Sequence, residues 1–526
     1  MALVPALAQW IEKEDTQMKN WKRLLATLMT LAMICTALPW TALAEAQPTE
    51  VIFYFLGEEL EDDKVVLAAI NEKLKEKLNC YMTVTYVPFG EVNTTYPLLL
   101  ASQTRMDAIF SAYFTGYGTL AGKNAFMEMT EDMLKTYAPI TWEHTPKEVW
   151  DQAKVNGKIY MVPQEMIQNI QATVGIRGDL REKYGLPEIT DLTSLENYMA
   201  AVHENESGIV PLLFGSMYGY LDDLLMFTPN EWASDGNFSQ LCMAYDLTEE
   251  APVPFCYLYT DEFRERCEIA YRWNQNGWIS KDSLSNTNTN RENMANGKTA
   301  VMLDNAGTVN SANEDLKKNG TGEFVEIYDL SGDKSMLRYA ATGGGISLPI
   351  NSEHPELVLQ IIDYLRNDKE MNYLVQRGIQ GEDAQWYFAG ELNEDGTLNE
   401  NVIAAGARSQ LYGGNWICWS AFRNWDYQVI ESEQNSIPGY REIFYDMDSR
   451  SVNNILQSFT FDSSMYQSEL ATMQNVYEQY GKPLRLGFVD PATGVDEYIQ
   501  MMEAAGLKTV IDAYVAQATA YVEANK

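Results

Sequence analysis

Apolar and polar residues alternate near the start of the chain in a way that predicts strands and helices in turn. Residues 51–55 form an apolar and aromatic run typical of a strand, and residues 63–78 carry apolar side chains at helical spacing. A second strand is predicted at 82–87, a helix at 92–102 and a third strand at 106–110. This βαβαβ order favours a parallel sheet, so the fold class that it indicates is α/β.

The rest of the chain continues to alternate between helix and strand patterns, and no fixed-period repeat interrupts them. The stretch 283–290, with the sequence SLSNTNTN, is interpreted as a polar surface loop or the approach to a helix. From about Ser436 the pattern becomes mainly helical, and it ends in two predicted helices at 496–505 and 507–524.

The N-terminal region has the features of a secretory signal peptide. Lys19, Lys22 and Arg23 precede an apolar run at 24–38, and small residues follow up to Ala44. The run is shorter than the ~20 residues that cross a bilayer, which makes a membrane anchor the less favoured alternative. We therefore predict a signal peptide at 1–44.

Two further expectations concern this region. Residues 1–17 contain acidic side chains that are unusual before a signal peptide, so translation is expected to start at Met18. Cys35 is a poor candidate for lipid attachment, because Met33 and Ile34 before it are larger than the small residues that such sites use.

Cysteine usage argues against a disulfide framework. The chain has six cysteines, one of which lies within the predicted signal peptide, and no two of them form a CxxC pair. Buried free thiols are expected, with one bridge among Cys242, Cys256 and Cys267 as the alternative.

The charge balance limits the partners of the protein. Lys and Arg total 38 against 74 Asp and Glu, which gives a formal net charge of −36. Nucleic acids and anionic membrane surfaces would be repelled, so binding to nucleic acid is excluded.

Several short motifs follow one another in an order that resembles a known family. They are DAIFSAY at 107–113, GKIYMVP at 157–163, NGKTAVM at 296–302, and ISLPINS at 346–352 with the helix that follows it to 365. In this order they resemble the extracellular solute-binding proteins of bacterial ABC importers, of the large two-lobed kind that captures sugars and oligosaccharides. The C-terminal part resembles one branch of that family, whose extension has no chemistry that we can assign.

The resemblance implies a two-lobed periplasmic-binding-protein-like fold of type II, with a ligand cleft between the lobes and a helical C-terminal part. Lobe I is expected to contain residues 48–163 and 305–370, and lobe II residues 164–304 and 371–526. The implied protein is an extracytoplasmic monomer at the outer face of the bacterial cytoplasmic membrane. It would capture a carbohydrate by hinge closure and deliver it to the permease subunits of an ABC importer.

A sugar site requires aromatic rings for the apolar face of the sugar and polar side chains for its hydroxyls. The chain is 12% aromatic. The candidate ligand-binding residues combine local aromatic clusters with polar positions near the expected crossovers: Tyr113, Tyr117, Gln164, Tyr218, Trp232, Asn305, Trp386, Trp416 and Trp419. Tyr160 and Pro163 are expected at the hinge. Any one of these aromatic residues could instead belong to a core, since three-residue spacing is typical of both.

No catalytic or metal-binding constellation is visible in the sequence. The three histidines, at 144, 203 and 354, lack a partner set for a triad or a zinc site. A calcium loop at 393–399 is rejected because Val402 stands where the bidentate Glu should be, so no cofactor is expected. A secreted glycoside hydrolase and a binding protein that feeds a membrane sensor remain the alternative functions.

Overall fold

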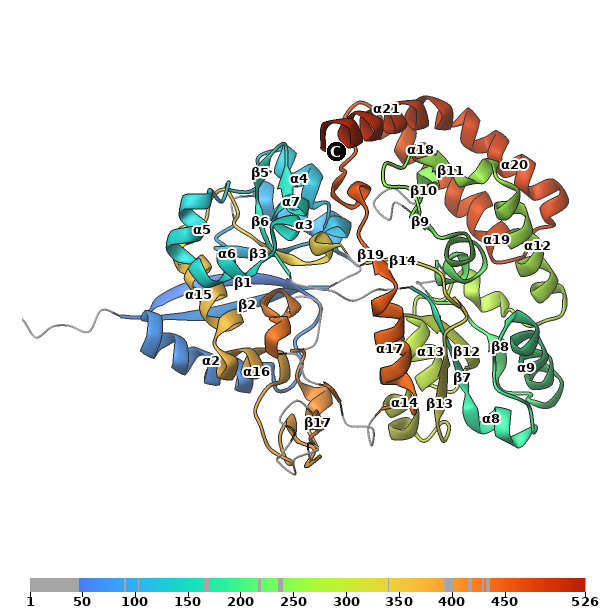
Figure 1. The fold of residues 1–526 in the computed structure, drawn as a ribbon, viewed down its shortest axis with the longest axis horizontal. Coiled ribbons are helices and arrows are strands. Elements are labelled where there is room, and N and C mark those ends of the chain that lie inside the picture. The colour runs from blue at the N-terminus through green and yellow to red at the C-terminus, as the bar shows by residue number, and fades with distance from the viewer. Residues whose placement is uncertain are drawn as a thin grey trace, which may run out of the picture. The chain divides into compact units, whose positions relative to one another are not determined.

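The computed structural model describes residues 47–88, 91–102, 104–164, 171–215, 219–234, 240–338, 340–391, 393, 399, 402–414, 419–427, 430–431 and 436–525. The predicted signal peptide at 1–44 and the rejected calcium loop, apart from its two end residues, lie outside this description. The described chain forms two α/β lobes (Figure 1). The chain belongs to lobe I up to residue 164 and to lobe II from 171; it is in lobe I again by 345 and in lobe II again from 440.

The sheet of lobe I has the strand order β2-β1-β3-β15-β6 among the described residues. It consists of β1 (Thr49–Leu56), β2 (Cys80–Val87), β3 (Ala108–Ser111), β6 (Met161–Pro163) and β15 (Gly345–Ser347). β1 and β3 are parallel, whereas β15 runs antiparallel to both β3 and β6. The predicted βαβαβ opening is therefore confirmed, with α2 (Asp63–Leu78) and α3 (Val92–Ala101) between the strands.

Other elements of lobe I surround this sheet. They are η2 (Tyr113–Thr115), α4 (Tyr117–Gly122), α5 (Glu131–Tyr137), α6 (Pro139–His144), α7 (Lys147–Gln152), β4 (Lys154–Val155), β5 (Lys158–Ile159), α15 (Pro355–Asn367), α16 (Lys369–Arg377), β16 (Trp386–Phe388), β17 (Val402–Ala405), η9 (Trp419–Phe422) and β18 (Ile430–Glu431).

The glycine run at 343–345, which has neither the spacing nor the partners of a phosphate-binding loop, is explained by close packing. A Cβ added to Gly345 would lie 2.5 Å from the carbonyl oxygen of Val162 on the neighbouring strand. A Cβ on Gly344 would lie 2.8 Å from Oε1 of Gln164. Glycine is needed here because β15 is inserted tightly between β3 and β6.

The sheet of lobe II has the order β13-β7-β12-β8 in the described part of the chain. Its strands are β7 (Thr173–Arg177), β8 (Val210–Leu212), β12 (Thr299–Asp304) and β13 (Val325–Tyr328). β12 is parallel to β8 and antiparallel to β7.

Other elements of lobe II follow the same chain order. They are α8 (Gly178–Lys183), α9 (Leu192–Asn205), α10 (Tyr220–Asp222), the π-helix η3 (Asp223–Phe227), α11 (Thr228–Asn230), β9 (Trp232–Ser234), β10 (Met243–Asp246), β11 (Phe255–Cys256), α12 (Asp261–Gln275), α13 (Asn290–Ala295), α14 (Ala306–Asn319), β14 (Met336–Leu337) and β19 (Ser451–Val452).

The expected lobe boundaries need two corrections. Residues 305–328 belong to lobe II, not lobe I, because β13 pairs with β7 before the chain returns. The segment 371–427 packs on lobe I, not lobe II: its apolar side chains join the lobe I core, and the Arg408 guanidinium binds the Asp62 carboxylate at 2.6 and 2.8 Å. The order of segments in the sequence did not reveal at which residues the chain changes lobes.

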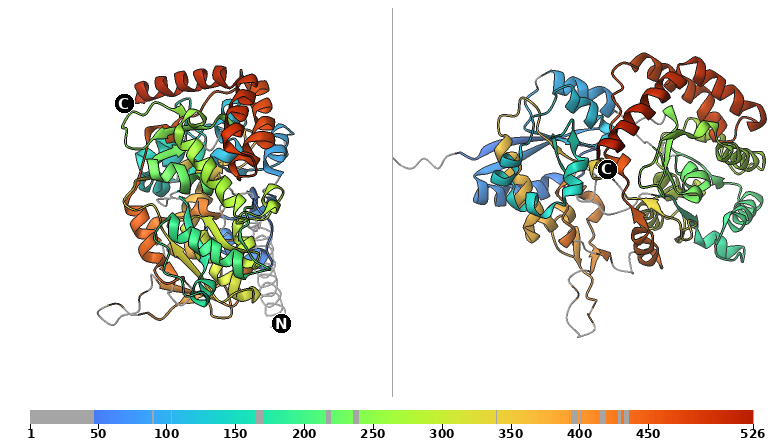
Figure 2. Two further views of the ribbon diagram at one scale, coloured as in Figure 1. Left: turned by 90° about the vertical axis from the view of Figure 1, so that its right-hand side faces the viewer. Right: turned by 45° about the horizontal axis from the view of Figure 1, so that its top comes forward.

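The C-terminal part is helical from α17 onward, as predicted. It contains α17 (Tyr440–Ser449), η11 (Ile455–Ser458), α18 (Gln467–Val476), the π-helix η12 (Tyr477–Gly481), α19 (Lys482–Arg485), α20 (Pro491–Ala504) and α21 (Leu507–Asn525). Helices α18 to α21 stack on the β9–β11 side of lobe II, and the end of α21 reaches toward lobe I (Figure 2). Their apolar faces share one core with lobe II.

A buried ion cluster joins α19 to lobe II. The Asp222 carboxylate accepts hydrogen bonds from the guanidinium groups of both Arg266 and Arg485, the latter at 2.5 Å. Arg485 also donates to the Tyr257 hydroxyl at 2.8 Å. All of these side chains are buried, so the single carboxylate compensates two guanidinium charges in the core.

The described cysteines are free and buried, in agreement with the expectation of free thiols: Cys80, Cys242, Cys256 and Cys267. Burial raises the pKa of the Cys80 and Cys267 thiols to about 11. These thiols are therefore poorly reactive at neutral pH.

We predict that Asp222→Asn destabilises the protein by about 3–5 kcal/mol, because two buried guanidinium groups lose their carboxylate. Urea unfolding of the variant and the wild type at pH 7 measures this loss. Glu131→Gln, in an exposed i,i+4 pair with Lys135, is the matched control and should leave the unfolding midpoint almost unchanged. Equal midpoints for both variants would contradict the assigned role of Asp222.

Candidate functional site

The ends of two strands from different lobes bring polar aromatic side chains together. Tyr113 follows β3 in lobe I, and Asp304 is the last residue of β12 in lobe II, near Tyr220 on α10. Burial raises the pKa of Tyr220 well above its ordinary value, and the charges of Asp304, Asp223 and Tyr113 add to the shift. The two phenols are therefore close enough to interact across the lobes. In α/β folds, ligands bind beyond such carboxyl ends of strands.

Tyr113 is the predicted ligand residue whose position fits best. It is half-buried and packs edge-on against Phe114, with ring centroids 5.5 Å apart. Tyr220, which sequence reasoning did not select, is its neighbour from the other lobe. The signal that could have found Tyr220 was its closeness in sequence to Tyr218, which was selected.

Asn305 lies at this site but uses much of its hydrogen-bonding capacity locally. Its side-chain oxygen accepts from the backbone N–H of Thr308, which caps α14. Its amide nitrogen donates to the Tyr220 hydroxyl at 3.3 Å and to Asp304 at 3.1 Å. Asn305 thus positions Tyr220 and Asp304 and leaves little capacity for a ligand.

Two carboxyl groups near Tyr220 have raised pKa values. Burial raises the pKa of Asp304 to about 6, partly offset by the hydrogen bond from the Asn305 backbone. Burial also raises the pKa of Asp223 to about 8, and the neighbouring Asp222 carboxylate adds to that shift. At neutral pH Asp223 is therefore mainly protonated, whereas Asp304 is mainly ionised.

The polar stretch 283–290 leads into α13, which confirms the interpretation of this stretch as the approach to a helix. Asparagine side chains from this region bind the end of β8: Asn290 accepts from Gly215 N–H at 3.0 Å and donates to Leu303 O at 2.9 Å. Asn293 donates to Leu213 O at 3.2 Å. These bonds hold the ends of β8 and β12 side by side beside Tyr220.

The predicted crossover residues lie where the chain leaves lobe I. Gln164 is buried, and its backbone N–H donates to Gly344 O at 2.8 Å. Pro163 ends β6, and its carbonyl accepts from Arg366 at 2.8 Å. Tyr160 is half-buried against the lobe I core. The hinge roles of Tyr160 and Pro163 remain predictions.

Three predicted ligand residues are core residues instead. The Tyr117 hydroxyl donates to Ala153 O at 2.5 Å inside lobe I. The indole of Trp386 donates to Gly378 O at 3.0 Å in a small apolar cluster. Trp419 is only 2% exposed, with its ring centroid 4.9 Å from that of Phe55. Aromatic side chains so enclosed cannot cover a sugar.

The remaining predicted aromatic residues divide into one described and two undescribed positions. Trp232 lies on β9 of lobe II and packs edge-on against Phe255, with centroids 4.9 Å apart. Tyr218 and Trp416 lie outside the described residues. Asp107, the first residue of the DAIFSAY motif, accepts hydrogen bonds from the backbone N–H groups of Ile52, Glu353 and His354.

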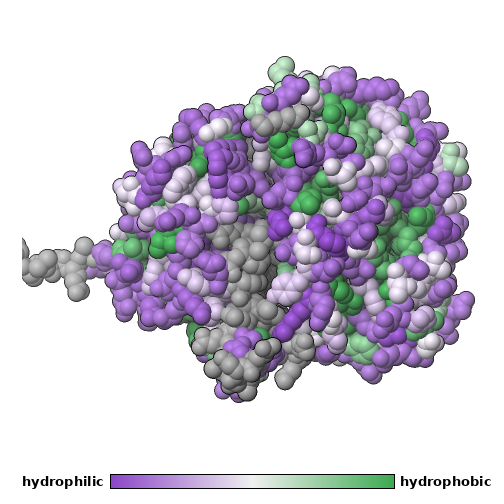
Figure 3. All heavy atoms as spheres, viewed as in Figure 1, coloured by the Kyte–Doolittle hydropathy of each residue, from purple (hydrophilic) through white to green (hydrophobic). Residues whose placement is uncertain are grey.

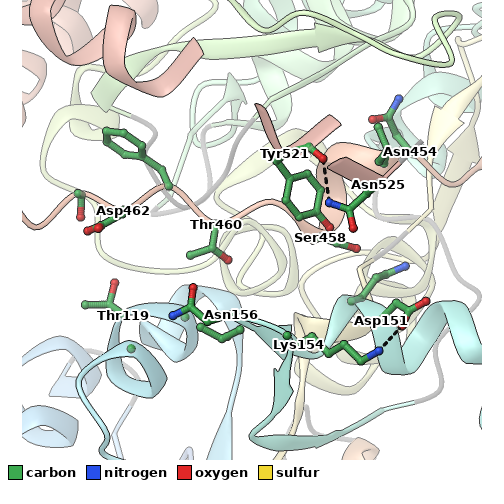
Figure 4. A pocket seen from close by; sticks show the side chains of 18 of the residues that line it. Thr119, Asp151, Lys154, Asn156, Asn454, Ser458, Thr460, Asp462, Tyr521 and Asn525 are labelled. Carbon is green, nitrogen blue, oxygen red and sulfur yellow. Dashed lines mark hydrogen bonds and ion pairs between the residues drawn. The ribbon is translucent and has the colours of Figure 1, made fainter. Parts of the chain in front are cut away.

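A separate polar cavity of about 1130 Å³ lies between lobe I and the C-terminal helices (Figure 4). Lobe I contributes α4, α7 and the β4–β5 turn, and the C-terminal part contributes η11, residues 460–464 and the end of α21. Most lining side chains are amides, hydroxyls and charged groups. Tyr113, Tyr220 and Asn305 are not among them.

The described residues contain no group of His, Cys, Asp and Glu that could hold a metal ion. No helix within the same residues has both the length and the apolar character to cross a bilayer. The face in Figure 3 is mainly hydrophilic, with apolar residues in scattered patches.

The fold is that of the two-lobed solute-binding proteins, and solved structures show this likeness over nearly the whole chain. An N-glycan transport solute binding protein (NgtS) from Streptococcus pneumoniae is 17% identical, with a TM-score of 0.69 over 91% of this chain and 100% of that chain. An HMO binding ABC-transporter associated solute binding protein from Bifidobacterium longum infantis ATCC 15697 is 14% identical, with a TM-score of 0.65 over 91% of this chain and 100% of that chain. The fold that the sequence resemblance implied is thereby confirmed.

Sequence comparison agrees with this class. A carbohydrate ABC transporter substrate-binding protein from Streptococcus pneumoniae serotype 4 (strain ATCC BAA-334 / TIGR4) is 20% identical over 508 residues, which cover 93% of this chain and 96% of the relative. Residues 455–523 match a family model described as a domain of unknown function, DUF3502. The expected resemblance to a carbohydrate-binding importer subunit is confirmed by this relative.

We predict that Asp304→Asn changes the pH dependence of stability. The pKa of Asp304 is raised in the folded protein, so its favourable contribution is complete below about pH 4 and is lost as pH rises through about 6. The variant should therefore gain on the order of 3 kcal/mol over the wild type between pH 4 and pH 7.

Urea titrations across this pH range measure the difference between Asp304→Asn and the wild type. Asp282→Asn, at an exposed position, is the control and should follow the wild type at every pH. A difference between Asp304→Asn and the wild type that does not change with pH would contradict the burial of an ionisable Asp304.

Proposed function

We propose that this protein is the extracellular solute-binding subunit of an ABC importer and that its ligand is a neutral oligosaccharide. The observation that carries the proposal is that Tyr113 of lobe I, beyond the end of β3, lies close enough to contribute to the raised pKa of Tyr220 of lobe II, near the end of β12. The half-buried ring of Tyr113 suits the apolar face of a sugar, whereas Tyr220 is buried in the lobe II core and offers its hydroxyl rather than its ring face. The neighbouring hydroxyls and the mainly protonated Asp223 carboxyl suit sugar hydroxyls, because they both donate and accept hydrogen bonds.

Charge supports an uncharged ligand. Asp223 is mainly protonated at neutral pH, and a protein of net charge −36 would repel an anionic one. The similar proteins point to the same class, since solved structures of NgtS contain Man1GlcNAc and Man5GlcNAc and one of FusA from S. pneumoniae contains kestose.

Capture by hinge closure follows from the architecture. Three short chain passages join the lobes, and a ligand held by Tyr113 and Tyr220 contacts both lobes at once. The loaded protein would then deliver its ligand to the permease subunits from outside the cytoplasmic membrane, after removal of the predicted signal peptide at 1–44. We propose that it acts as a monomer and binds without turnover.

We predict that neutral oligosaccharides stabilise the protein against thermal unfolding. A ligand at 100 times its dissociation constant adds about 2.7 kcal/mol to the free energy of unfolding. The panel is Man1GlcNAc, Man5GlcNAc, kestose and fructo-nystose, with an alginate trisaccharide as the anionic contrast. Stabilisation by the anionic sugar alone would overturn the proposal of a neutral ligand. Release of new reducing ends from the sugars would favour the alternative function, a secreted glycoside hydrolase.

We predict that Tyr113→Ala and Trp419→Ala have opposite effects. Tyr113→Ala removes a ring that stacks on the sugar. It should weaken binding of the best sugar in the panel about tenfold while the unfolding midpoint stays nearly constant. Trp419→Ala should cost about 3–5 kcal/mol of stability, because it empties a packed core. Isothermal titration and melting of both variants test this. Normal affinity in Tyr113→Ala would show that the ligand lies elsewhere.

A further inference from the structure

The domain of unknown function at 455–523 is attached to lobe II but reaches lobe I. Helices α18, α20 and α21 share a core with β9–β11 of lobe II. The Arg485 guanidinium, bound to Asp222, fixes α19 to the same lobe. The residues before α18 must therefore move with lobe II. The end of this domain nevertheless lies opposite lobe I, where both line the polar cavity.

Besides the packing of η11 against α7, the domain contacts lobe I at Gly118. A Cβ added to Gly118 on α4 would lie 2.6 Å from Cγ2 and 3.2 Å from Oγ1 of Thr460. The Thr460 side chain therefore rests directly on the backbone of α4. That helix is fixed within lobe I by Tyr117, whose ring stacks on Phe126 and whose hydroxyl donates to Ala153. The contact between Gly118 and Thr460 is thus a contact between the lobes.

The space around this point is open. Gly118 and Thr460 both line the cavity of about 1130 Å³, and Figure 4 shows Thr460 above Thr119 and Asn156 with room between the two walls. Farther along, α7 packs against η11, and Asp151 of α7 and Tyr521 of α21 line the same cavity. The cavity walls can approach or separate, but Thr460 cannot come closer to Gly118.

We propose that the domain at 455–523 is a steric stop between the lobes, with Thr460 resting on Gly118, and that this contact is coupled to ligand binding. Nothing covalent joins these two residues, and the lobes turn about the three chain passages. A rotation that brings these walls together would compress the contact, and one that separates them would break it, so the contact would contribute to the balance between lobe arrangements. A ligand that favours one arrangement then binds with an affinity that depends on this contact.

Gly118→Ala tests the proposed stop, because the added methyl group would collide with the Thr460 side chain. Both Gly118 and Gly122 lie on α4 without a left-handed φ, and a Cβ at Gly122 meets nothing within 4 Å. Gly122→Ala is therefore the matched control, since both changes favour the helix equally. Thr460→Ala removes the two colliding atoms, so the double variant Gly118→Ala/Thr460→Ala should behave as the wild type.

The first measurement needs no ligand. Spin labels on a genetically encoded keto amino acid at positions 132 and 318, exposed sites on α5 and α14, report the separation of the lobes and avoid the native thiols. Gly118→Ala should shift the label distance, Thr460→Ala alone should shift it in the other direction or broaden it, and Gly122→Ala should leave it unchanged. Equal distances in all variants would overturn the stop. Melting of each variant confirms that it is folded, and Thr460→Ala remains informative if Gly118→Ala does not fold.

The second measurement is affinity for Man5GlcNAc, or for the best binder of the panel, and this arm alone rests on the proposed function. Gly118→Ala should change the dissociation constant at least about threefold, with restoration in the double variant. An unchanged constant together with a shifted label distance would reject the coupling. No binding by any variant or the wild type would count against the proposed ligand class and would leave the distance result to decide the stop.

Discussion

One buried carboxylate between two guanidinium groups determines how the C-terminal half of the molecule is organised. Asp222 receives Arg266 from α12 and Arg485 from α19, deep in a core that lobe II shares with the last helices. Charges placed there are costly unless they are matched, so the three elements must stay together. The C-terminal domain is consequently a part of lobe II in mechanical terms, although it follows the last passage of the chain between the lobes.

The same carboxylate also affects the candidate site. Asp223 is its neighbour in the chain, and the Asp222 charge helps to raise the pKa of Asp223. A protonated carboxyl beside Tyr220 is a hydrogen-bond donor as well as an acceptor, which matches a hydroxyl-rich ligand better than a fixed negative charge does. Stability and ligand chemistry are therefore linked through two adjacent aspartates.

The sequence predicted the opening of lobe I and the helical C-terminal part, because these depend on local periodicity. The ligand-binding role of Tyr113 stays a prediction. The sequence could not separate Trp419 from a ligand residue, since aromatic spacing looks the same on a core segment and on a binding edge. Tyr220 and Asp304 were missed because their burial arises from the packing of lobe II elements that lie far apart in the sequence. The predicted lobe boundaries were wrong for a similar reason. β13 pairs with β7, about 150 residues earlier, and such long-range pairing leaves no local pattern in the sequence.

The strand order of lobe I has a consequence for how the chain acquires its fold. β15 lies between β3 and β6, yet it is synthesised more than 180 residues after β6. Until β15 has been synthesised, the edges of β3 and β6 that it joins stay unpaired, and the space that Gly345 fills between them stays empty. The sheet of lobe I therefore cannot be complete when only the first 163 residues of the chain have been synthesised. Its folding must be slow and late, because the strand that joins β3 to β6 is so distant in sequence.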